Sequence, residues 1–207
     1  MKPDSEQGCP WPLDQDTLVY EVENEAEDLA PGESIAAIEQ AIVLWNAVLE
    51  KLEIPLRFRE KQGEEEVHVC FSWKHHDLNT PFSVAPVAHA DFPPACGVLS
   101  TGLPRPVQFE ARQDWAVDSS DPDRLSIVFV AVHEIGHILG LPHSSNPRSV
   151  MFSSLYHSEE PTEVDENALR ELYKEHIALN VSMPPGWPEI LLPPPSPMML
   201  AVCAAQA

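Results

Sequence analysis

An α+β fold is predicted for this chain of 207 residues, and three observations predict it. The first half contains segments of alternating apolar and polar side chains around one segment with helical spacing, in the order β-α-β-β. After a long stretch with many prolines come an apolar helix and then a last helix with one apolar face. A chain of this length can bury a full core as one domain, without disulfides or metal ions to hold it together.

The predicted strands and the first helix lie in the amino-terminal half. Residues 17–22 form the first predicted strand, and residues 31–34 have the composition of a helix start. The stripe that would face the core from this helix consists of Ile35, Ile38, Ile42, Trp45 and Leu49. Further strands are predicted at residues 56–59 and 67–71, with a shorter one at 107–109.

Two helices are predicted in the second half. The first covers residues 125–139 and is apolar enough to be buried. Its candidate N-caps are Asp121, Asp123 and Ser126. The last helix is predicted at residues 164–179, and the side chains expected to face inward are Ala168, Leu169, Leu172 and Tyr173. We therefore expect an extension at 1–8, a folded domain at 9–180 and a flexible tail at 181–207, where seven prolines favour extended chain.

Composition excludes several classes of partner. The 33 acidic and 12 basic residues give a formal net charge of −21, which repels nucleic acid and anionic membranes. The sequence has no run of 18 apolar residues and no apolar segment of the secretory-signal type at its start, so we expect no membrane span and leave the compartment open. We expect a monomer. The four cysteines are widely spaced, which predicts free thiols instead of disulfides.

The strongest functional signal is the sequence His-Glu-Ile-Gly-His that begins at His133. His133 and His137 are four positions apart, so both imidazoles can reach one metal ion from the same helix face. Glu134 can point toward the fourth coordination position and take a proton from a water molecule there. The less specific interpretation is a chance motif with histidines packed in the core.

A third histidine makes the chance interpretation weaker. His143 would lie roughly 15 Å away if the helix continued straight, so the chain must turn back. Gly140 permits that turn because it accepts a positive φ, and Pro142 prevents the helix from resuming. Three histidine ligands leave one zinc position open, which favours a catalytic over a purely structural zinc.

These residues resemble the matrixins, a family within the metzincin metallopeptidases, over about residues 9–175. Ser144 follows the third histidine as it does in matrixins, and Met151 stands where the family has its Met-turn methionine. The start at residues 9–20 is similar to the family's opening strand. Asp165 matches the aspartate of the closing helix that braces the Met-turn in the family.

The resemblance implies a zincin-like fold, with a twisted mixed sheet of five strands, three helices and an active-site cleft. It also implies a zinc-dependent metalloendopeptidase that cuts internal peptide bonds of protein or peptide substrates, with Glu134 as general base and then acid. The edge strand near Val87 and Ala88 would bind the substrate backbone, and Tyr156 would line a specificity pocket. An extracellular location is implied by analogy alone.

The sequence also departs from the family pattern. Of the ligands for the family's second, structural zinc, His75, Asp77 and His89 match, but Gln108 replaces the fourth, and glutamine is a poor zinc ligand. The second zinc therefore stays an open alternative. The glycine-rich calcium loop is replaced at residues 83–86, which weakens the expectation of calcium.

Two alternatives remain open at this stage. One is that Cys9 or Cys96 supplies a thiol that caps the zinc in place of the family's cysteine switch, which the sequence lacks in its usual form; an ordinary free cysteine is far commoner. A non-catalytic, zinc-binding interaction module with the matrixin fold is the second functional hypothesis. The intact Glu134 argues against that module.

Overall fold

The computed structural model describes residues 8–75, 87–97, 102–121, 123–153 and 158–182. A five-stranded mixed sheet forms its centre, with the strand order β2-β1-β3-β5-β4. The bounds are β1 Thr17–Val22, β2 Arg57–Glu60, β3 Val69–Lys74, β4 Ala88–Ala90 and β5 Arg105–Glu110. Neighbouring strands run parallel except for β4, which is antiparallel to β5. The expected α+β fold with a mixed five-stranded sheet is therefore confirmed.

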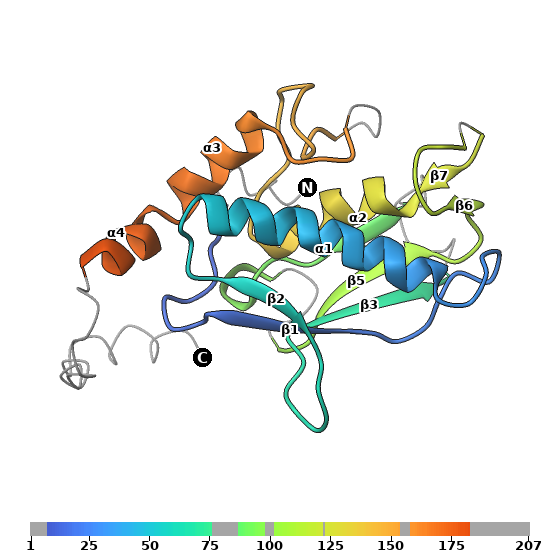
Figure 1. Ribbon diagram of the computed structural model, residues 1–207, viewed down its shortest axis with the longest axis horizontal. Coiled ribbons are helices and arrows are strands. Elements are labelled where there is room, and N and C mark those ends of the chain that lie inside the picture. Colours follow the sequence, from blue (N-terminus) through green and yellow to red (C-terminus); the bar gives the residue numbers. More distant parts are fainter. Residues whose placement is uncertain (1–7, 76–86, 98–101, 122, 154–157, 183–207) are drawn as a thin grey trace, which may run out of the picture.

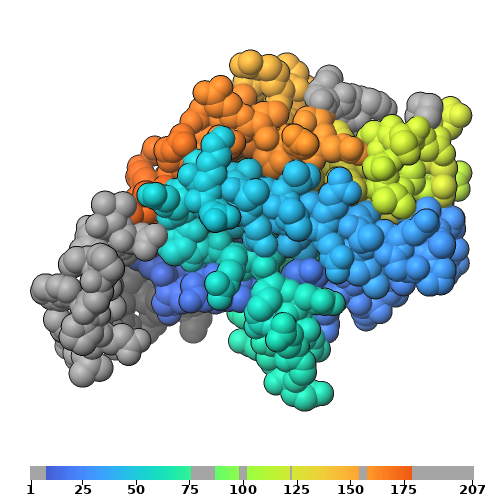
Figure 2. Space-filling model, in the orientation of Figure 1, coloured from blue at the N-terminus to red at the C-terminus, as the bar shows by residue number. Residues whose placement is uncertain are grey.

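Two long helices pack against each other and against this sheet. They are α1 at Glu33–Lys51 and α2 at Ile127–Ile138, and Figure 1 shows α1 crossing one face of the sheet. The space-filling view shows α1 in the middle of this face, between α3 (Glu163–Leu172) and the projecting connection from β2 to β3 (Figure 2). The smaller elements are η1 Pro94–Cys96, β6 Trp115–Ala116, β7 Leu125–Ser126 and α4 Lys174–Ser182. No helix in these described ranges has the length and apolar character needed to cross a membrane.

The predicted elements agree closely with the structure where hydrophobic periodicity is strong. β1 has the predicted bounds, and α1 buries Ile38, Ile42, Trp45 and Leu49 of the predicted stripe. Ser126 is the N-cap of α2, and its Oγ accepts a hydrogen bond from the Phe129 amide at 3.1 Å. In contrast, the last predicted helix is divided at Tyr173 into α3 and α4, and Ala168 is exposed.

The expectation of free thiols was wrong for two cysteines. Cys9 and Cys96 form a disulfide with a Cα–Cα distance of 6.2 Å. Their separation of 87 residues explains the error, because the spacing alone does not show which segments meet in the fold. A latent state that relies on the thiol of either residue does not fit this bonded pair. Cys70 is the free cysteine among the described residues, and Cys203 lies outside them.

Candidate metal centre

α2 holds the candidate metal-binding residues because it is buried on every side. Eleven of its twelve residues are buried, including His133, Glu134 and His137. The indole of Trp45 in α1 donates a hydrogen bond to the Val132 carbonyl at 2.8 Å, which fixes the helix one residue before His133. A helix held this firmly places side chains with little freedom of movement.

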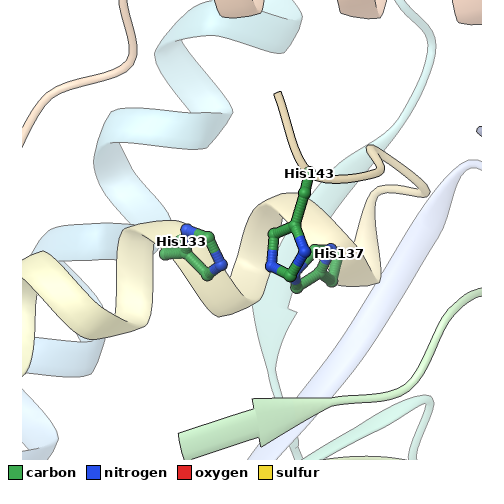
Figure 3. A group of neighbouring side chains, drawn as sticks. All are labelled: His133, His137 and His143. Carbon is green, nitrogen blue, oxygen red and sulfur yellow. The ribbon is translucent and has the colours of Figure 1, made fainter. Parts of the chain in front are cut away.

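The three histidines converge on one point (Figure 3). One ligand nitrogen from each of His133, His137 and His143 lies within 4.8 Å of the others, and among the described residues this is the group of metal-binding type. The Nε2 atoms of His137 and His143 are 3.3 Å apart. Two nitrogens about 2.0–2.1 Å from a tetrahedral zinc would be about 3.3–3.4 Å apart. The spacing of this pair therefore fits zinc.

Backbone carbonyls fix which nitrogens of the two helical histidines face the centre. The Nδ1 atom of His133 lies 2.7 Å from the Val150 carbonyl oxygen, and the Nδ1 atom of His137 lies 2.8 Å from that of Leu141. A carbonyl accepts only from a protonated nitrogen, so each Nε2 is left with a lone pair for a metal. Burial lowers the pKa of His133 to about 4 and that of His137 to about 3, which keeps both rings neutral.

The turn that brings His143 back is made by Gly140. Its φ of 91° lies in the left-handed region, and a Cβ at this position would be 1.9 Å from the Cys9 carbonyl oxygen. The Gly140 amide donates to the His137 carbonyl at 2.8 Å, and the Leu141 amide donates to the Gly136 carbonyl at 2.9 Å. Only glycine fits this position, because both the dihedral angle and the close approach exclude a side chain.

Met151 lies directly against α2. A Cβ added at Gly136 would be 2.2 Å from the Met151 sulfur, so the absence of a side chain next to His137 makes room for the methionine. Asp165 holds the chain before Met151, because its carboxylate accepts hydrogen bonds from the Ser149 hydroxyl and, at 3.2 Å, from the Val150 amide. Asp165 is 1% exposed and belongs to the capping box of α3.

Glu134 combines burial with an unsatisfied oxygen. The side chain accepts a hydrogen bond from the Ala90 amide of β4, but Oε2 has no hydrogen-bond partner in the described structure. Burial raises the pKa of this carboxyl group to about 8, and the Ala90 hydrogen bond partly opposes the rise. A buried oxygen without a partner is costly, so this atom points to a ligand such as water or substrate.

The other residues singled out in the sequence lie in several places. Val87 and Ala88 lie at the start of β4, the last strand in the sheet order. His89 pairs with Gln108 across β4 and β5, and His75 Nδ1 lies 3.9 Å from a Glu110 carboxylate oxygen. Asp77 and Tyr156 are outside the described residues, so the second zinc and the specificity pocket stay predictions.

Sequence reasoning missed three aromatic residues that border the site. The Phe92 ring packs edge-on to His137, with ring centroids 5.4 Å apart. The Trp11 indole donates to the Ile138 carbonyl at 2.7 Å, and the Tyr173 hydroxyl donates to the Leu139 carbonyl at 2.9 Å. No local pattern could have revealed these contacts, because the partners are far apart in the sequence.

Comparisons with known proteins agree with this geometry. A family model described as Matrixin matches residues 10–174. Human Matrix metalloproteinase-15 is 33% identical over 141 residues, which cover 65% of this chain and 20% of that protein. Human Matrix metalloproteinase-26 is 30% identical over 159 residues, or 74% of this chain and 54% of that protein. Karilysin from Tannerella forsythia is 29% identical over 150 residues, which cover 70% of this chain and 29% of that protein. The chain therefore spans between 20% and 54% of these curated relatives.

Proposed function

Since this chain belongs to the matrixin family, we propose that it is a zinc-dependent endopeptidase that hydrolyses internal peptide bonds of proteins. One observation carries the proposal. Three histidine nitrogens lie within 4.8 Å of one another, with the His137–His143 pair at zinc spacing, and a buried carboxylate next to the first histidine has an oxygen without a hydrogen-bond partner. A purely structural site would need neither the open fourth position nor the unsatisfied Glu134.

In this proposal His133, His137 and His143 hold the zinc. When bound, the zinc supplies a Lewis acid that lowers the pKa of a water molecule and polarises the scissile carbonyl. Glu134 accepts the proton of the attacking water and then delivers it to the leaving amine. Burial raises the pKa of Glu134 above its ordinary value, and the positive charge of a bound zinc would favour the carboxylate form that accepts the proton.

The substrate would bind along β4. This strand ends the sheet order, and β5 pairs with one of its edges. An extended peptide can add to the other edge through backbone hydrogen bonds, which makes protein and peptide segments the natural substrate class. The hydrogen bond between Ala90 and Glu134 brings this strand next to the catalytic carboxylate. We propose that Val87 and Ala88 contact the substrate backbone and that Tyr156 lines the pocket beyond it.

A digestion of a peptide library tests the proposal, with zinc content measured on the same samples. We expect the wild type to bind zinc and cut, and Glu134→Gln to keep its zinc but lose about 10²–10⁴-fold in rate. The matched control is Glu171→Gln, which makes the same change on an exposed side chain paired with Lys174. Full activity in Glu134→Gln would contradict the mechanism.

Three other outcomes are informative when the zinc content of His89→Ala is measured as well. A wild type that binds zinc but cuts nothing across a broad library would support the non-catalytic interaction module instead. A content of two zinc ions that falls to one in His89→Ala would establish the second, structural site. A content of one zinc in both proteins would exclude that site.

A further inference from the structure

The carboxyl end of α2 needs partners that the helix cannot provide. The last carbonyls of a helix have no amide four residues ahead to bond with. In α2 the carbonyls of Ile135, Gly136 and His137 accept from the amides of Leu139, Leu141 and Gly140 within the turn. The next three carbonyls, at Ile138, Leu139 and Gly140, are the ones that lead the chain toward His143. Their hydrogen-bond donors come from other parts of the chain.

The segment Cys9–Trp11 supplies two of these three partners. The Trp11 indole donates to the Ile138 carbonyl at 2.7 Å, and the Cys9 amide donates to the Gly140 carbonyl at 3.0 Å. The third partner is the Tyr173 hydroxyl, which donates to Leu139 and also accepts from the Trp11 amide at 3.3 Å. His176 Nε2 lies 3.0 Å from the Trp11 carbonyl oxygen. Trp11 is therefore held on several sides and is 2% exposed.

The disulfide joins the segment Cys9–Trp11 to a second segment that contacts the histidine group. Cys96 ends the segment that begins at Asp91 and contains Phe92, whose ring packs against His137. Asp91 forms a fully buried ion pair with Arg105, which anchors the start of the segment in the core. One covalent bond therefore connects the segment that bonds to the turn after His137 with the segment that packs against the His137 ring.

We propose that Cys9 and Trp11 are positioning residues for the metal ligand His143, and that the Cys9–Cys96 disulfide makes metal retention depend on the oxidation state of the chain. Trp11 and Cys9 act through their hydrogen bonds to the carbonyls of Ile138 and Gly140. These bonds fix the backbone between the second and third histidines. His143 is the exposed member of the group, so it relies on its backbone for its place more than the two helical histidines do. This inference rests on the proposed function only in assuming that the three histidines bind a metal ion.

Reduction of the disulfide would remove the covalent connection. A water-soluble phosphine supplies the two electrons: the sulfur–sulfur bond breaks, the phosphine is oxidised to its oxide with an oxygen from water, and two thiols form. The segment Cys9–Trp11 would then be held at the end of α2 by its hydrogen bonds alone. We expect the reduced protein to release zinc to a chelator faster than the oxidised protein does.

The first test compares Trp11→Phe with Trp73→Phe. Both changes remove a buried indole N–H, but the Trp73 Nε1 has no hydrogen-bond partner in the described structure, whereas the Trp11 Nε1 bonds to Ile138. Metal affinity is measured by chelator competition, and the visible spectrum of the cobalt-substituted protein reports whether three nitrogens remain bound. We expect about tenfold weaker binding and a weaker tetrahedral cobalt spectrum in Trp11→Phe, and little change in Trp73→Phe. Equal affinities and spectra in the two variants would overturn the positioning role.

The second test compares Cys96→Ser with Cys70→Ser, which removes the free thiol. We expect faster zinc release in Cys96→Ser, no further effect of the phosphine on it, and a normal response to the phosphine in Cys70→Ser. Circular dichroism establishes that each variant is folded. If Cys96→Ser retains zinc as the wild type does, the redox dependence is refuted. A wild type without a three-nitrogen cobalt spectrum would instead refute the proposed function, so the two failures are distinguishable.

Discussion

The two ends of α2 are held in different ways. At the amino end the Ser126 hydroxyl accepts from the amide of Phe129 three residues later and donates to the Glu159 carboxylate, and the Val128 amide donates to the Val117 carbonyl. At the carboxyl end Trp11 and Tyr173 bond to Ile138 and Leu139 across sequence separations of 127 and 34 residues. The helix amides at the amino end bond to partners 3 and 11 residues away in the sequence, whereas the carbonyls of Ile138 and Leu139, at the end that must place a ligand, bond to distant side chains.

The largest effect is expected from Gly140→Ala at the carboxyl end. The change forces a side chain into the left-handed region and places its Cβ 1.9 Å from the Cys9 carbonyl oxygen. We expect a loss of roughly 2–5 kcal/mol in the free energy of unfolding, measured by urea denaturation. Gly32→Ala is the matched control, because Gly32 has a φ of 89° but open space around its Cβ position. Equal losses in the two variants would show that the contact with Cys9 is unimportant.

Removal of the metal should loosen the carboxyl end more than the amino end. A metal present at 100 times its Kd stabilises the native state by about 2.7 kcal/mol, and a chelator removes this contribution. Hydrogen exchange can locate the effect. We expect the amides of Gly140 and Leu141 to exchange faster after chelation, with a smaller change at Phe129. A uniform change along the helix would mean that the metal stabilises the whole fold equally.

A smaller effect is expected from Tyr173→Phe. The hydroxyl has two partners, the Leu139 carbonyl and the Trp11 amide, and both are left without it in the variant. We expect a loss of roughly 1–3 kcal/mol in the free energy of unfolding together with weaker zinc binding. Thermal denaturation and chelator competition measure the two quantities. Loss of stability without any loss of zinc affinity would separate the cap from the metal site.

The smallest effect is expected from Ser126→Ala at the amino end. Loss of the capping hydroxyl should lower the free energy of unfolding by about 1 kcal/mol. Zinc affinity should not change, because the cap lies seven positions before His133 and the rest of α2 keeps its packing. A drop in zinc affinity as large as that in Tyr173→Phe would remove the distinction between the two ends.

The same distinction explains how much the sequence could predict. β1, α1 and Ser126 were predictable because periodicity and capping are local, and the pair of His133 and His137 was predictable because helix geometry fixes their spacing. The turn toward His143 was predictable from the glycine at position 140. The pairing of Cys9 with Cys96 and the contacts of Trp11 were not, because chain separation carries no information about which segments meet. Ala168 was misplaced, since α3 buries Leu169 and turns its neighbour outward.

The contact between Trp11 and the closing helices has a consequence for how the domain is made. Trp11 meets Tyr173 and His176 across 162 and 165 residues, almost the full length of the folded part. Such contacts give a high contact order, and their loop-closure entropy is lost before they contribute any stability. During synthesis the hydrogen bonds of Trp11 with Tyr173 and His176 can form only after those two residues have left the ribosome. Under the proposed positioning role of Trp11, the place of the third histidine therefore depends on residues that are synthesised after it.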